Sequence, residues 1–146
     1  MRKLTLLSLL IVPFLVKGTN YVSIANGDWN SPTTWSPGGI PGKSDNATIN
    51  TNVTIASGDP QQYVQNLTIN SGFTLTDNKD IFILNLLTNN GGFAGSGQVM
   101  FEGKNQTIVS GTGSFPFSGI YYFGFKGGAR ETIASGVNIN SNATMT

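Results

Sequence analysis

The stretch that decides the fold is Thr48-Ile49-Asn50-Thr51-Asn52-Val53-Thr54-Ile55, because its pattern recurs along the chain. It aligns without gaps on Thr68-Ile69-Asn70-Ser71-Gly72-Phe73-Thr74-Leu75 and again on Asn138-Ile139-Asn140-Ser141-Asn142-Ala143-Thr144-Met145. The shared unit reads apolar-Asn-Ser/Thr-Asn/Gly-apolar-Thr-apolar. The first two copies recur with a period of about 20 residues, which is typical of one turn of a β-helix, in which each coil stacks its short strands on those of the next coil.

Short runs of alternating apolar and polar residues surround this unit, and the chain after Gly18 lacks helical periodicity. The corners between the runs carry Ser57-Gly58, Ser71-Gly72 and Ser135-Gly136, where we expect each glycine to supply the positive φ that a tight corner needs. We therefore predict an all-β chain that forms a right-handed parallel β-helix, or solenoid, of short strands. Alternation alone also fits a β-sandwich, which is the alternative.

The composition favours a folded protein over a disordered one. Charged residues make up 10% of the 146-residue chain, against roughly 25% in typical soluble domains, whereas Gly, Asn, Thr and Ser together supply 64 positions. Disordered chains are normally rich in charge and poor in aromatic and β-branched residues, and this chain has neither property. Its polar surface must consist mainly of hydroxyl and amide groups.

The segment from Met1 to Gly18 has the organisation of a secretory signal peptide. Arg2 and Lys3 precede an apolar stretch over residues 4–16, so we expect cleavage near Thr19 and export to the cell surface or the extracellular space. A membrane anchor is the alternative, but this stretch is shorter than the ~20 residues that a spanning helix needs, and we expect no membrane span after cleavage. The chain from Thr19 onward has five basic and seven acidic residues, which excludes a basic patch for nucleic acid.

The residue types present exclude most catalytic chemistry. The chain has no His and no Cys, so it cannot build a Ser-His-Asp or Cys-His arrangement or a zinc site of imidazoles and thiolates. The loop over residues 77–80 lacks the pattern of a calcium-binding loop, and we interpret it as a solvated turn. We predict that the protein is not an enzyme and has neither cofactor nor metal. The carboxylates show no spacing that argues for a glycosidase pair: Asp28, Asp45, Asp59, Asp77, Asp80, Glu102 and Glu131.

Three aromatic residues are candidates for stacking on the ring of a ligand: Trp29, Trp35 and Tyr122. Strand alternation places Tyr121 and Phe123 on the core side and leaves Tyr122 facing out. The two tryptophans flank a loop that contains proline and would bury a large apolar area. We therefore favour a second interpretation for them, in which they plug the open end of the first coil.

Two further parts of the sequence carry a family resemblance. The first is Asn26-Gly27-Asp28-Trp29-Asn30-Ser31-Pro32-Thr33-Thr34-Trp35, continued by Gly39-Ile40-Pro41-Gly42 and Asp45-Asn46-Ala47-Thr48-Ile49. The second is Gly97-Gln98-Val99-Met100-Phe101-Glu102-Gly103 with Gln106-Thr107-Ile108-Val109-Ser110-Gly111. Both resemble segments of large exported surface proteins of Bacteroidetes, and the first also resembles the opening of the G8 domain. The resemblance covers nearly all of residues 21–146 and implies an adhesin-like protein with a parallel β-helical body.

These observations predict three parts: a signal peptide over residues 1–18, a capping segment with the paired tryptophans over 19–46, and solenoid repeats over 47–146 that stop within a repeat. The expected function is that of a non-catalytic, adhesin-like structural module of the cell surface, as a fragment of a larger protein. The alternatives are a glycan-binding domain of the G8 type and the remnant of a polysaccharide-degrading β-helix. Expected partners are a surface polysaccharide or other repeats of the same protein, with self-association through an uncapped C-terminal edge.

Overall fold

The structure is a computed structural model that describes the backbone of residues 17–102, 107–115, 121–125, 131–133, 138–139 and 143–145. Side chains are described for residues 17–102 and 108–113. The apolar stretch of the predicted signal peptide, over residues 4–16, lies outside the described residues.

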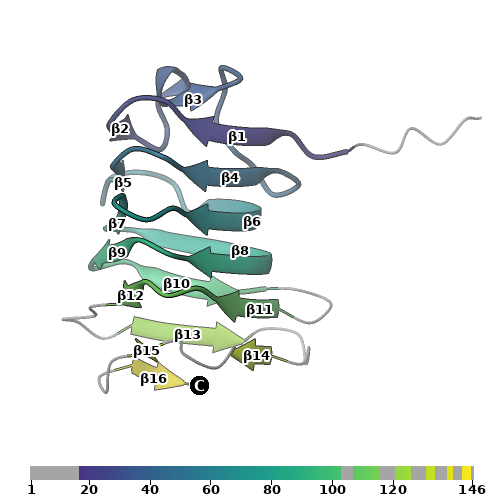
Figure 1. The fold of residues 1–146 in the computed structure, drawn as a ribbon, viewed down its shortest axis with the longest axis vertical. Coiled ribbons are helices and arrows are strands. Elements are labelled where there is room, and N and C mark those ends of the chain that lie inside the picture. Colours follow the sequence, from purple (N-terminus) through teal and green to yellow (C-terminus); the bar gives the residue numbers. More distant parts are fainter. Residues whose placement is uncertain are drawn as a thin grey trace, which may run out of the picture.

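The chain folds into short strands and one 3₁₀ turn, η1 (Pro32–Thr34). Apart from the antiparallel pair of β1 and β3, the strand pairs among the described residues are parallel. Parallel stacking identifies a β-solenoid, as predicted, and excludes the antiparallel sandwich that was the alternative (Figure 1). The strands are β1 (Asn20–Ser23), β2 (Gly27–Asp28), β3 (Trp35–Ser36), β4 (Asn46–Ile49), β5 (Val53–Ile55), β6 (Gln62–Ile69), β7 (Thr74–Asp77), β8 (Asp80–Asn89), β9 (Gly92–Gly95), β10 (Gln98–Phe101), β11 (Thr107–Ser110), β12 (Ser114–Phe115), β13 (Tyr121–Phe125), β14 (Glu131–Ile133), β15 (Asn138–Ile139) and β16 (Ala143–Met145).

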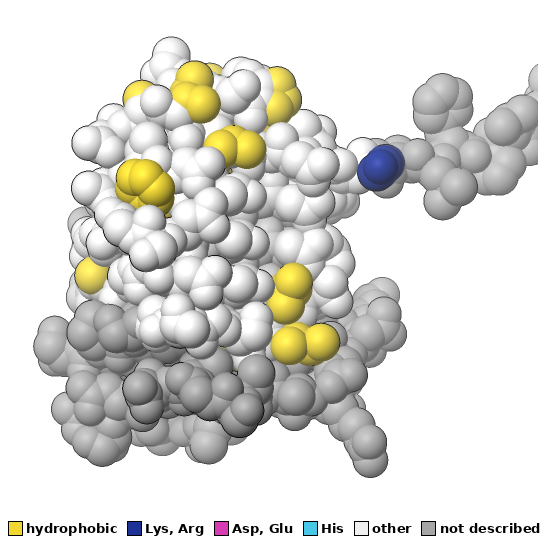
Figure 2. Space-filling model, in the orientation of Figure 1, with side chains coloured by type: hydrophobic (Ala, Val, Ile, Leu, Met, Phe, Trp, Pro, Cys, Tyr) yellow, Lys and Arg dark blue, Asp and Glu magenta, His cyan; other side chains and the backbone are white. Residues whose placement is uncertain are grey.

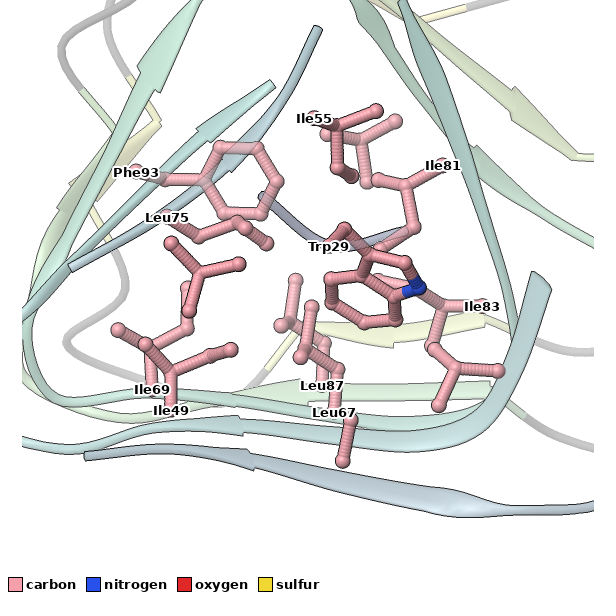
Figure 3. Packing of buried hydrophobic residues seen from close by; sticks show 14 of the residues in the cluster. Trp29, Ile49, Ile55, Leu67, Ile69, Leu75, Ile81, Ile83, Leu87 and Phe93 are labelled. Atoms are coloured by element: carbon pink, nitrogen blue, oxygen red, sulfur yellow. The ribbon is translucent and has the colours of Figure 1, made fainter. Parts of the chain in front are cut away.

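The stacked strands form three faces around a lumen, and the ribbon seen from close by outlines a triangle (Figure 3). The first face holds β1, β4, the second halves of β6 and β8, and then β11 and β14. The second face holds β2, β5, β7, β9, β12 and β15. The third face holds the first halves of β6 and β8, followed by β10, β13 and β16. Both β6 and β8 therefore run around a corner.

The length of a coil varies from corner to corner. On the first face Thr48 pairs with Thr68, in agreement with the repeat in the sequence. On the second face Val53 pairs with Leu75, and not with Phe73 as the gapless alignment implies. The alignment is wrong there because the path from Ile69 to Leu75 is two residues longer than the path from Ile49 to Val53, although both pairs of ends are in register. Phe73 instead lies before β7, partly buried against the core.

The lumen is filled by apolar side chains from alternate positions of the strands from β4 to β11. Ile49 stacks on Ile69, and Leu67 stacks on Leu87, each fully buried (Figure 3). Burial of a Leu or Ile side chain stabilises a fold by about 1.5–3 kcal/mol relative to exposure, so this column of side chains is the main source of stability. The other aliphatic and phenylalanine core positions share the same inward orientation: Ala47, Val53, Ile55, Val64, Leu75, Ile81, Ile83, Phe93, Val99, Phe101 and Val109.

The corner glycines behave in two ways. Gly72 has φ +86°, as predicted for a corner that only glycine tolerates well. Gly58 does not have a positive φ, so the prediction is wrong there, because the loop after β5 turns without a left-handed residue at that position. Gly136 lies outside the described residues. The structure adds Gly95 and Gly111, with φ +109° and +114°, which the Ser-Gly pattern did not identify.

The solenoid starts earlier in the chain than the predicted repeat region. β1 pairs with β4 and β2 pairs with β5, so residues 20–28 already contribute two faces of a first coil. The segment that leaves the coil runs from Trp29 to Ser44 and includes η1 and β3. β3 runs antiparallel to β1 and covers its outer edge at the N-terminal end (Figure 1).

Candidate functional site

The two tryptophans predicted as stacking residues both lie inside the molecule. Trp29 and Trp35 have 0% and 1% of their surface exposed, and their rings meet edge to face with centroids 4.9 Å apart. The Trp35 Nε1–H donates a hydrogen bond to the Trp29 carbonyl oxygen at 2.8 Å. Figure 3 places Trp29 within the triangular outline among the aliphatic side chains. Neither ring offers a face to a ligand, since both rings are packed against protein.

Local hydrogen bonds explain why this segment turns back over the coil. The Asp28 side chain accepts the Asn30 N–H at 2.7 Å, and the Asp28 carbonyl accepts the Thr34 hydroxyl at 2.8 Å. The backbone N–H of Trp29 donates to the Thr54 carbonyl at 2.8 Å, which holds the start of the loop on the second coil. Gly27 leaves room for the Thr34 hydroxyl, because a Cβ on Gly27 would lie 2.8 Å from Thr34 Oγ1.

The third candidate, Tyr122, lies in β13, where its backbone is in register with Thr144 of β16. Its side chain is outside the described residues. The three candidates are therefore not brought together into one site by the part of the molecule that the structure describes: two are in the core beneath the N-terminal loop, and the third is on a strand of the third face.

An aromatic column that the sequence reasoning missed lies on the outside of the third face. Tyr63 and Phe82 are in register on β6 and β8, and their rings stack with centroids 4.6 Å apart and an interplanar angle of 15°. Lys43 Nζ lies 5.2 Å from the Tyr63 ring centroid, and Met100 is in register with Phe82 on the next coil. Only 8% of Phe82 is exposed. The two rings mainly cover each other. The sequence held a signal for this pair: an aromatic residue recurs about one coil later, in a second alternating run.

An asparagine ladder runs along the first face, parallel to the solenoid axis. Asn46 donates from Nδ2 to Asn20 Oδ1 at 2.6 Å, Asn66 donates to Asn46, and Asn85 donates to Asn66 at 2.7 Å. Each amide nitrogen donates toward the N-terminal end, so one chain of hydrogen bonds joins four successive coils. Ladders of this kind are typical of stacked parallel strands, where identical side chains repeat at the strand spacing.

Asparagines at the corners make a second set of contacts between coils. Asn26 Oδ1 accepts the N–H of Asn52 at 2.8 Å, Asn52 Oδ1 accepts the N–H of Thr74 at 3.0 Å, and Asn90 Oδ1 accepts the N–H of Thr112 at 3.3 Å. In each case an amide from one coil satisfies a backbone donor of the next coil. The abundance of Asn in the sequence therefore has a structural explanation.

Most described carboxylates hold turns and do not form a cluster. Asp45 accepts the N–H of Thr19 and that of Gly42 through its two oxygens, and Asp59 accepts the N–H of Ala56. Within the described part of the chain, no group of three or more His, Cys, Asp or Glu side chains is placed to hold a metal ion. No helix among these residues has the length and apolar character required to cross a bilayer.

Asp77 is the exception among the carboxylates. The loop over 77–80 was predicted to be a solvated turn, but Asp77 is 0% exposed, because the alternation of β7 points it inward together with Leu75. Its Oδ1 accepts the Lys79 N–H at 3.0 Å, while Oδ2 has no partner among the described residues. Burial raises the pKa of Asp77 to about 7; the Lys79 hydrogen bond opposes this rise, and the nearby Asp80 charge adds to it.

No protein-family model, curated protein or solved structure matches the chain.

Proposed function

We propose that the chain is a non-catalytic, exported structural module of the adhesin-like kind, which presents a rigid polar surface outside the cell. The observation that carries the proposal is the use of surface polar groups as ties between coils. The ladder from Asn20 to Asn85 and the corner contacts of Asn52 and Asn90 run between coils and not toward a common point. Such an arrangement reinforces a rod and does not assemble a reaction centre.

The low charge of the surface supports the same proposal. Figure 2 shows a face made mainly of uncharged polar side chains and backbone, with scattered apolar residues. Cysteine is absent from the sequence, so the molecule depends on its filled lumen and on its ladders and not on disulfides. Hydrogen bonds that bridge successive coils limit local opening, which suits a protein that works without the protection of a cell interior.

The described residues give the alternatives less support. Glycan binding would be favoured by a row of open aromatic faces, but Tyr63 and Phe82 stack on each other and Trp29 is buried. A polysaccharide-degrading site would be favoured by paired carboxylates on one face. Asp28, Asp45 and Asp59 instead each accept a backbone N–H of a turn, from Asn30, Gly42 and Ala56.

Export can be tested with the full chain, from Met1 onward, in a Gram-negative host. We expect the protein outside the cytoplasm, with an intact mass that corresponds to a start near Thr19. A matched variant with Leu7→Arg and Leu10→Arg interrupts the apolar stretch and should leave the precursor inside the cell. Recovery of the unaltered chain in the cytoplasm with Met1 retained would contradict the proposal.

The absence of catalysis can be tested on the same secreted material. The purified protein is incubated with cellulose, amylose and dextran, and both retention on the insoluble polymer and release of reducing ends are measured. The proposal predicts no release of reducing ends from any of the three. Release above that of a heat-denatured control would refute the non-catalytic part.

A further inference from the structure

Two corners of the solenoid are built on the same plan. β7 ends at Asp77 and β8 ends at Asn89, and both side chains point inward and are fully buried. Asp77 Oδ1 accepts the N–H of Lys79 at 3.0 Å, and Asn89 Oδ1 accepts the N–H of Gly91 at 3.1 Å. Each residue thus uses one side-chain oxygen to close the turn that follows it.

The next coil meets both corners in the same way. The Asp77 carbonyl accepts the N–H of Gly97 at 2.7 Å, and the Asn89 carbonyl accepts the N–H of Gly113 at 2.8 Å. A Cβ on Gly97 would lie 2.5 Å from Asp77 Oδ1, and a Cβ on Gly113 would lie 2.7 Å from Asn89 Oδ1. A Gly-x-Gly segment therefore closes over each side chain, and both side chains are shielded from solvent.

The two corners differ in the chemistry of the second side-chain atom. In Asn89 this atom is an amide nitrogen, which is a donor, and it is not among the buried atoms without a partner. In Asp77 it is Oδ2, which has no partner among the described residues. A neutral carboxyl carries no charge into this buried position, as an amide does not, whereas a carboxylate places an uncompensated charge there.

We infer that the Asp77 corner is a proton-operated latch, which closes the coil when the carboxyl is neutral and loosens it when the carboxyl ionises. Among the described residues, the groups around it give the ionised form no counter-charge. Asp80 is the charged neighbour and carries the same sign, and Lys79 contacts Asp77 through its backbone. The adjacent coils contribute Ile55 and Gly95 in register, neither of which titrates.

The direction of the effect follows from the shift of the pKa. Burial raises the pKa of Asp77 to about 7, whereas an Asp in an unfolded chain titrates near 3.9. Between about pH 4 and pH 7, the folded state therefore holds a proton on Asp77 that the unfolded state has released. The contribution of this proton to stability is fully present below about pH 4 and is lost as the pH rises to about 7. The Asp77 corner therefore loosens as the pH rises. This inference does not depend on the function proposed above.

The test compares the unaltered chain with Asp77→Asn in urea denaturation from pH 5 to pH 8. We expect the unfolding equilibrium constant of the unaltered chain, divided by that of the variant, to rise about a hundredfold across this range. The reciprocal variant Asn89→Asp should add a second dependence of the same sign. The latch is refuted if the profiles of the unaltered chain and Asp77→Asn run parallel.

A direct measurement covers the case in which Asn89→Asp does not fold. The carboxyl carbon of Asp77 is followed by NMR in the folded, unaltered chain, and its resonance is assigned by its loss in Asp77→Asn. We expect a titration midpoint near the raised pKa of about 7. A midpoint near the ordinary value of about 4 would overturn the inference, whatever the variants do.

Discussion

Gly95 allows the sharpest test of the corner geometry. Its φ of +109° lies in a region that L side chains rarely adopt, and a Cβ at this position would overlap the carbonyl oxygen of Asp77 on the preceding coil. Gly95→Ala introduces both costs. Backbone strain contributes about 1–3 kcal/mol, and forcing an atom into a packed site contributes about 1–3 kcal/mol more. We expect a loss of about 3 kcal/mol or more in the free energy of unfolding, within the combined range of these two costs.

The matched control is Gly58→Ala. Gly58 does not have a positive φ, and a Cβ built on it meets no atom within 4 Å. We expect this variant to unfold within about 0.5 kcal/mol of the unaltered chain, as is usual for a surface substitution. Equilibrium urea denaturation of both variants at one pH gives the comparison. Equal stabilities for Gly95→Ala and Gly58→Ala would refute the stacked-corner reasoning.

Three further substitutions test the core, the ladder and the N-terminal loop. The reference for all three is Thr54→Ala, because Thr54 is an exposed residue on the second face. Leu67→Ala should cost about 2–5 kcal/mol in urea denaturation, because it opens a cavity in a filled lumen. Asn66→Ala removes two ladder hydrogen bonds and should cost about 1–2 kcal/mol, read from the same transition. Trp35→Phe keeps a buried ring but leaves the Trp29 carbonyl without its donor, so a loss of about 1–3 kcal/mol is expected by thermal denaturation. If one of these variants loses no more stability than Thr54→Ala, the contact that it removes does not stabilise the fold as argued.

The architecture could be predicted from the sequence because the deciding signals are local. The unit from Thr48 to Ile55 carries both the strand alternation and the repeat, and the pairing of Thr48 with Thr68 follows from it directly. The second face could not be placed in the same way. A corner can take up two extra residues without changing either strand, so the pairing of Val53 with Leu75 depends on the path of the corner and not on the repeat unit.

The corner glycines show a second limit. The Ser-Gly pattern pointed to Gly58, but the left-handed conformation is found at Gly95 and Gly111, where a carbonyl of the preceding coil leaves no room for a Cβ. This requirement belongs to the stacking of coils and is invisible in a single turn. The inward position of Asp77, by contrast, was available from the sequence, because it is two residues after the core residue Leu75 on an alternating strand.

The candidate site was the part least accessible to sequence reasoning. Trp29 and Trp35 have the residue type of a stacking platform, and only their packing against one another shows that both are buried. Tyr63 and Phe82 became neighbours through the register of β6 and β8, which brings together positions that lie almost a full coil apart along the chain. Residue type alone does not distinguish an open ring from a covered one.

Disulfide trapping tests the central claim, the parallel stacking of successive coils, most directly. The chain has no cysteine of its own, and Thr48, Thr68 and Thr88 occupy one half-buried column on the first face. Adjacent strands lie about 4.8 Å apart, within the Cα separation of about 4.4–6.8 Å that a disulfide accepts. Mild oxidation of the folded protein should therefore cross-link the double variant Thr48→Cys with Thr68→Cys and leave Thr48→Cys with Thr88→Cys as free thiols. Cross-linking of the second pair in the monomer, or failure of the first, would contradict the solenoid register.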